Sequence, residues 1–262
     1  MIVLKQELKS NRKTLLIWSL SVGLMIFGFM IMFPGLKDTL KDASESYANM
    51  GGFSTAFGLD KLNIGSVMGY YSTEIGSVLA LGGALFASLL GAGMLSKEEG
   101  SHTAEFLFSF PVSRISIILQ KFIAMELIVI AFNLICALLA LLSFAIIGES
   151  IEAKEFTLYH LAQLGMHSEI ACICFCISAF LKKSNIGLGL GVALILYFGD
   201  IMSRIIPDLK FLKYITPFYY ANAADIFTDG YLNVILIVIG LTVSIIAIVI
   251  AIIKYKNKDI AS

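Results

Sequence analysis

Residues 122–147 read FIAMELIVIAFNLICALLALLSFAII, and this stretch decides the class of fold. Glu126 is its only charged side chain. A helix needs about 20 residues to cross the hydrocarbon core of a bilayer, and this stretch is longer than that. It therefore predicts a membrane-spanning helix.

Five further apolar blocks of similar length surround this stretch. They lie at 14–33, 75–96, 161–181, 184–203 and 231–253. Of the 262 residues, 58% are apolar and 15% are charged, and the mean hydropathy is +0.88. Soluble domains are nearer half apolar and a quarter charged, so an ordinary soluble enzyme is excluded. The sequence predicts an all-α integral membrane protein with six transmembrane helices in a single domain, residues 1–262.

The distribution of lysine and arginine predicts the orientation of the six spans. Segments 1–13, 97–121, 182–183 and 254–262 hold 12 basic residues in 49 positions, whereas the opposite face holds 7 in 81. Basic residues accumulate in cytoplasmic loops. We therefore expect a multi-pass protein of the bacterial cytoplasmic membrane with both termini in the cytoplasm. The formal net charge of zero gives no indication of nucleic-acid binding.

The segment before the first span mixes apolar and basic residues. Leu4 and Leu8 lie one helical turn apart among Lys5, Lys9 and other basic side chains. This pattern is typical of a helix that lies in the membrane interface, so residues 1–13 are predicted to form an N-terminal interfacial helix. A disordered basic terminus is the alternative.

Small residues at four-residue steps predict close helix packing in two spans. The second span carries Gly83, Ala87 and Gly91 on one row, and the fifth carries Gly187 and Gly191 on one face. Small residues let two helix backbones approach closely in lipid. Contacts within the chain are the simplest interpretation, and a dimer interface is the alternative.

The sequence lacks the motifs of an enzyme. It contains no GxxxxGK[ST] phosphate-binding loop, no HExxH and no GxSxG. If the protein uses ATP, another chain must bind the nucleotide.

The stretch between the second and third spans, SKEEGSHTAEFLFSFPVSR at 96–114, is the most informative loop. Thr103 is predicted to cap a short helix that Pro111 ends, and Ser113 to cap the next. An apolar patch of Phe106, Leu107 and Phe110 would then lie beside acidic side chains. Those acids are Glu98, Glu99 and Glu105. Such a surface is typical of a docking site for a protein partner, and a helix that dips its phenylalanines into lipid is the alternative.

This loop resembles that of the permease subunits of ABC type-2 exporters, which reads approximately EExxGTLEFLLSLPVSR. The matching residues are Glu98, Glu99, Thr103, Glu105, Phe106, Leu107, Ser109, Pro111, Val112, Ser113 and Arg114. His102 and Ala104 depart from the pattern. Weaker similarity covers Phe57-Gly58, the segment 69–71, Lys121 and the segment 212–218.

The resemblance implies an exporter built from two permease copies, as a homodimer or a paralogue heterodimer, and two separate ABC ATP-binding subunits. ATP and Mg would be bound by the partner subunit, and this chain would bind no cofactor of its own. The loop residues Glu98, Glu99, Thr103, Glu105, Phe106, Leu107, Phe110, Pro111 and Arg114 would form a cytoplasmic coupling helix against the ATPase. Short outer re-entrant helices would precede the sixth span, between 205 and 230.

Charged residues inside spans are costly and are candidates for function. Glu126 lies about one turn beyond Lys121 and is predicted to pair with it. Asp200 and Arg204 lie four residues apart near the outer end of the fifth span and are predicted to pair on one helix face.

His167 and Glu169 open the predicted fourth span, close to three cysteines, and raise the possibility of a metal site. Those cysteines are Cys172, Cys174 and Cys176. One continuous helix cannot bring all these side chains together, so no metal site is predicted and the cysteines are interpreted as small packing residues.

The sequence therefore favours the membrane subunit of an ATP-driven exporter in contact with membrane lipids. An ATP-independent channel or membrane scaffold is the alternative. The apolar spans favour an amphipathic or lipid-like cargo over a bare ion, which would need a hydrated path.

Overall fold

The computed structural model describes residues 2–101, 103 and 113–258, and every regular element in these ranges is a helix. Six of these helical segments are long and apolar enough to cross a membrane, which confirms the predicted number of candidate spans. They are α1 (Ile2–Ala48), Val67–Met94, α7 (Arg114–Ile147), α8 (Ala153–Phe180), α9 (Ile186–Ile205) and α11 (Val234–Lys256). The second combines α3 (Val67–Tyr70), the π-helical turn η1 (Tyr71–Ile75) and α4 (Gly76–Met94).

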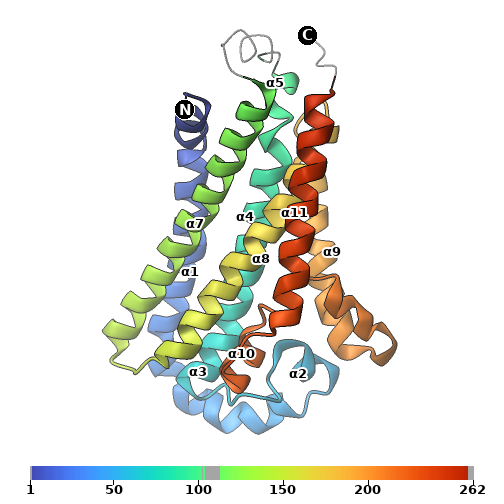
Figure 1. Ribbon diagram of the computed structural model, residues 1–262. Helices are drawn as coiled ribbons and strands as arrows, with labels where there is room; N and C mark the ends of the chain where they lie inside the picture. Colours follow the sequence, from blue (N-terminus) through green and yellow to red (C-terminus); the bar gives the residue numbers. More distant parts are fainter. Residues whose placement is uncertain (1, 102, 104–112, 259–262) are drawn as a thin grey trace.

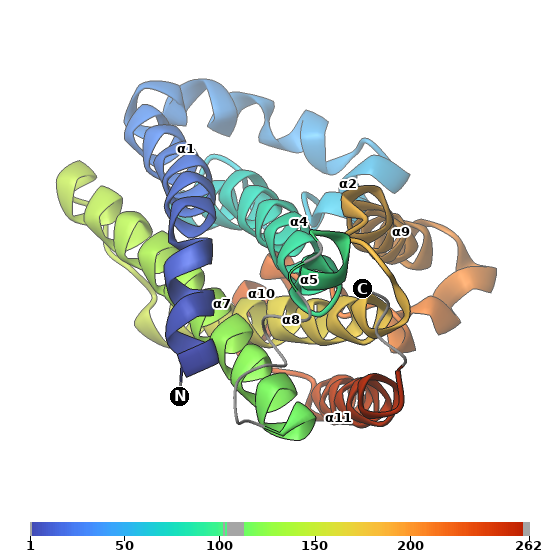
Figure 2. The ribbon, with the colours of Figure 1, turned by 90° about the horizontal axis from the view of Figure 1, so that it is seen from above.

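The long helices form one bundle with distinct ends. The start of α1, the short helix α5 (Lys97–Gly100) and the end of α11 lie together at one end (Figure 1). The short helices α2 (Gly52–Phe57), α3 and α10 (Ala223–Asp229) gather at the other. Seen along the bundle, α4 lies near the centre, with α8 beside it (Figure 2). An even number of spans accounts for this arrangement of the two termini.

Helix α1 differs from the prediction at both ends. Residues 2–13 are helical, but they continue without a break into the first span, so no separate interfacial helix is present. Val3 and Glu7 are buried there, whereas Leu4 and Leu8 are only partly buried. The helix also continues through Pro34, and its last part lies across the far end of the bundle (Figures 1 and 2). Proline removes one backbone hydrogen bond and bends a helix without necessarily ending it.

Helices α7 and α8 begin well before the apolar blocks that predict them. Their first turns contain polar residues that the sequence pattern assigned to loops. As a result His167 and Glu169 lie near the middle of α8, not at its start. Ser113 caps α7, because its side chain accepts a hydrogen bond from the Ser116 amide at 3.2 Å, as predicted.

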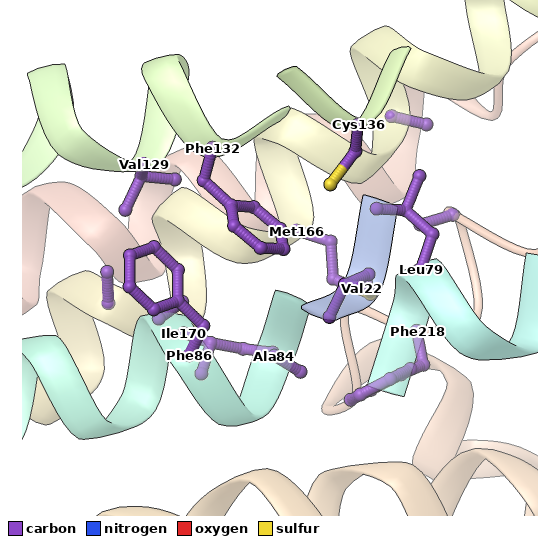
Figure 3. Close-up of a cluster of buried hydrophobic side chains, with 14 of the residues drawn as sticks. Val22, Leu79, Ala84, Phe86, Val129, Phe132, Cys136, Met166, Ile170 and Phe218 are labelled. Carbon is purple, nitrogen blue, oxygen red and sulfur yellow. The ribbon is translucent and has the colours of Figure 1, made fainter. Parts of the chain in front are cut away.

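The core lies where α4, α7 and α8 meet. The rings of Phe86 on α4 and Phe132 on α7 stack with their centroids 4.7 Å apart, and Met166 and Ile170 of α8 lie beside them (Figure 3). All four side chains are fully buried. Stacked rings contribute beyond the area they bury, so this contact helps to fix α4 against α7.

The small residues of α4 pack against α8. A Cβ atom on Gly83 would lie 2.1 Å from the His167 ring, and one on Gly91 would lie 2.5 Å from the Ala171 carbonyl. Ala87, between them on the same row, is fully buried. The Gly83, Ala87 and Gly91 row therefore serves packing within the chain.

The glycines of α9 do not share one role. Gly189 faces α4, where a Cβ atom would lie 2.9 Å from the Ser88 carbonyl. A Cβ atom on Gly191 would meet no described atom within 4 Å, and one on Gly187 would meet only Asn185 of its own helix start. The face that carries Gly187 and Gly191 is therefore open among the described residues.

Candidate coupling site and buried charges

The end of the bundle that holds both termini contains a buried lysine. Lys121, on the second turn of α7, has no exposed surface. Its ammonium group donates to Glu7 Oε1 at 2.7 Å, to the Met94 carbonyl at 2.8 Å and to Glu98 Oε1. An ammonium group has three hydrogens, so each of them has an acceptor.

Four further contacts extend this network. Lys97 pairs with Glu7, and Lys258, just beyond α11, pairs with Glu99 at 2.6 Å and donates to the Leu181 carbonyl. Arg114, the first residue of α7, donates to the Lys258 carbonyl at 2.7 Å. We name this network the charge clamp; its ionic members are Glu7, Lys97, Glu98, Glu99, Lys121 and Lys258.

The charge clamp contains three acids and three lysines, so its formal charges cancel. It connects α1, α5, α7 and the end of α11, which are far apart in the sequence. Buried charges are tolerated only when they are paired and hydrogen-bonded. The segment between α5 and α7 is therefore anchored at both of its ends, by α5 before it and Arg114 after it.

The structure gives two of the predicted docking acids a different environment. Glu99 is only 8% exposed, and both Glu98 and Glu99 are engaged with lysines of this chain. Both acids are therefore held in ion pairs within this chain. Glu105, Phe106, Leu107, Phe110 and Pro111 lie outside the described residues. Thr103 is described: its amide donates to the Glu98 carbonyl at 2.9 Å, and its hydroxyl lies 2.9 Å from that of Ser101.

Glu7, Lys97 and Lys258 belong to this network but were not predicted from the sequence. They lie from 90 to 159 positions from their ion-pair partners, and no local spacing rule relates them. One signal was present, because Val3 and Glu7 are four residues apart and so share a helix face. That face packs against α7, and the Leu4 amide donates to the Gln120 side chain there at 3.3 Å.

Glu126 does not pair with Lys121, contrary to the prediction. All hydrogens of Lys121 are used in the charge clamp. Glu126 instead lies beside Ser168 and Cys172 of α8, and the Cys172 thiol donates to its Oε1 at 3.6 Å. Local spacing suggested the wrong partner, because the two acids that pair with Lys121 are Glu7 of α1 and Glu98 of α5.

His167 and Glu169 face different neighbours. His167 Nδ1 lies 3.0 Å from the Asn133 amide oxygen, in the core beside Gly83. Glu169 Oε2 accepts a hydrogen bond from the Tyr220 hydroxyl at 3.0 Å. Among the residues that the structure describes, no group of three or more His, Cys, Asp or Glu side chains is placed to hold a metal ion.

A second charged cluster lies at the opposite end of the bundle. Arg204 Nε lies 3.1 Å from both oxygens of Asp200, as the four-residue spacing predicts. Arg204 also reaches Asp225 of α10 at 2.9 Å, and Lys61 reaches the same carboxylate at 2.5 Å. Burial acts to raise the pKa of Asp225, but Arg204 and Lys61 outweigh it and hold that pKa below its ordinary value of 3.8.

The six candidate spans and the buried ion pairs at both ends define a multi-pass membrane protein. Its sequence matches that of the ABC-2 family transporter proteins over residues 1–260, so the chain belongs to this family. The family comprises membrane permeases that lack ATPase domains and that generally pair with ATP-binding subunits. No curated protein matches the sequence.

Proposed function

We propose that this chain is the transmembrane subunit of an ATP-driven exporter, and that segment 97–114 couples it to a separate ATP-binding subunit. The charge clamp is the observation that carries the proposal. A partner that displaces the loop would displace α5 and Arg114, whose contacts reach α1, α7 and the end of α11. Such a network converts a local movement into a change between two arrangements of the spans.

Family membership supports the existence of an ATP-binding partner. The uneven distribution of basic residues supports the side of the membrane on which that partner binds. The charge clamp and both chain ends lie on the face that holds 12 of the 19 basic residues. This bias is typical of the cytoplasmic side, where ATP is available. In this orientation α2 and α10 lie outside, and the short helix η2 (Pro207–Tyr214) with α10 would shield the exit as re-entrant elements.

The coupling can be tested by cysteine labelling in native membrane vesicles. Ser101 is exposed beside the loop, and Arg12 is exposed on α1 at the same end. In inside-out vesicles we expect an impermeant maleimide to label both Ser101→Cys and Arg12→Cys, and ATP with vanadate to slow labelling of Ser101→Cys only. Labelling of Ser101→Cys in right-side-out vesicles, or a rate that ATP does not change, would contradict the proposal.

We also propose that a second permease copy packs on α9. Gly187, Gly191, Ile195 and Gly199 follow one another at four-residue steps on this helix, and Ile195 is 73% exposed. A Cβ atom on Gly199, as on Gly191, would meet no described atom within 4 Å. A row of glycines with room above it is typical of helix dimer interfaces in membranes.

Disulfide crosslinking tests this interface. In a background without the four native cysteines, Ile195→Cys should form a crosslinked dimer on oxidation in the membrane. Leu134→Cys on α7, 58% exposed, is the matched control and should stay monomeric. Equal crosslinking at the two positions would exclude α9 as the interface.

A further inference from the structure

A cavity of about 540 Å³ lies between α7, α8 and α11. Seen along the bundle, α11 lies on the side of α8 away from α4 and α9 (Figure 2). Leu241 and Ile245 of α11 and Leu161 of α8 line it and are more than half exposed. The cavity therefore opens sideways toward lipid, away from the α9 face, and its volume suits a drug-sized ligand.

Two carboxyl groups from different helices reach this apolar cavity. Glu126 comes from α7 and Glu169 from α8. Glu169 is 4% exposed, and no hydrogen bond from a described residue reaches its Oε1 atom, since Tyr220 binds Oε2. Among the described residues, neither acid has a basic partner. The cavity thus combines apolar walls with two acids that no basic side chain of the described residues neutralises.

Helix α11 is shaped to receive the Glu169 carboxylate. A Cβ atom on Gly240 would lie 2.3 Å from Glu169 Oε2, so only glycine leaves room for the acid there. One turn further, Ser244 lines the cavity beside Cys172. The acid is therefore fitted between two helices at a defined position on the wall of the cavity.

We propose that this cavity binds a hydrophobic organic cation with a single positive charge. Apolar walls would cover the body of such a ligand, one ionised carboxylate would neutralise its single charge, and the other acid would stay protonated in this apolar region. A phospholipid fits poorly, because its phosphate would face the same carboxylates. As a cargo site the cavity rests on the proposed function, whereas binding itself requires no ATPase.

Binding of tetraphenylphosphonium to the full chain in nanodiscs of neutral lipid tests the site. We expect saturable binding, and tetraphenylborate, which has the same shape and the opposite charge, should not compete. Glu169→Gln and Glu126→Gln should each weaken binding about tenfold or more. Glu149→Gln, whose carboxylate pairs with Lys37 outside the cavity, is the matched control and should bind normally.

Three results would overturn the proposal. They are absence of saturable tetraphenylphosphonium binding, equal binding of tetraphenylborate, and unchanged affinity in the Glu126→Gln/Glu169→Gln double variant. If the acid variants do not fold, Ser244→Phe fills the cavity while keeping both acids, and it should abolish binding. If binding holds but no ATPase partner exists, the proposed function fails and the binding site stands.

Discussion

Lys121 shows how one residue of α7 can connect its helix to three others, α1, α4 and α5. Removing its side chain leaves Glu98 without a basic partner among the described residues and Glu7 with Lys97 alone, and breaking a buried ion pair costs roughly 3–5 kcal/mol. We therefore expect Lys121→Met to lower the thermal unfolding temperature of the detergent-purified protein strongly. Lys182→Met, at an exposed position, is the control.

A compensating variant distinguishes the lost charge from the lost packing. Adding Glu98→Gln to Lys121→Met removes the acid that has lost its basic partner, so part of the stability should return. If Lys121→Met melts like the wild type, the charge clamp does not exist as described.

Asp225 makes the end of the bundle opposite the termini sensitive to acid. Its pKa is lower in the folded protein than in the unfolded chain, so its contribution to stability is present above about pH 4 and is lost as the pH falls through the folded-state pKa. Asp225→Asn should cost about 2 kcal/mol at pH 7, the scale of a hydrogen bond to a charged group.

The pH dependence of unfolding checks this sign. The difference in unfolding temperature between the wild type and Asp225→Asn should be largest near pH 7 and should shrink below pH 4. A difference that grows toward low pH would contradict the ion pairs of Asp225 with Arg204 and Lys61.

At the scale of elements, Gly91 and Gly191 each lie in a row of small residues at four-residue steps, but only Gly91 is packed against another helix. Gly91→Ala places a methyl group 2.5 Å from the Ala171 carbonyl, and overpacking of this kind costs roughly 1–3 kcal/mol. Gly191→Ala meets open space and should leave subunit stability unchanged. Thermal unfolding followed by circular dichroism measures both, and equal effects would contradict the described α4–α8 contact.

The elements divide clearly into those that the sequence predicts and those it does not. Each span is a long apolar block, and a period of 3.6 residues places Asp200 beside Arg204, so both follow from local pattern. Local pattern does not predict the polar first turns of α7 and α8 or the continuation of α1 past Pro34. Packing rather than hydropathy sets those helix ends.

The site was predictable only in part for a related reason. The loop pattern at 96–114 indicates where coupling is expected, but Glu7 meets Lys121 across 114 positions. Local spacing assigned Lys121 to Glu126 instead. Partners that are distant in sequence are set by the arrangement of helices, which neither composition nor period determines.

At the scale of the whole molecule, the two ends of the bundle have different designs. The end with the termini carries the charge clamp, next to the proposed coupling segment in the sequence, and the other end carries the Asp200, Arg204, Asp225 and Lys61 cluster. Between them the lipid-facing helices keep large exposed apolar side chains. A partner ATPase acting on the first end would reach the spans through four connected elements.

The identity of proteins that copurify with the tagged chain from its native membrane tests this account most directly. In mild detergent, mass spectrometry should find one ATP-binding protein with a P-loop in equal amount. This protein should no longer copurify with the Phe106→Asp/Phe110→Asp variant. It should still copurify with Phe53→Asp, which changes an exposed residue of α2 at the opposite end of the bundle. Recovery of the chain alone, or only with itself, would contradict the account and favour a channel or scaffold.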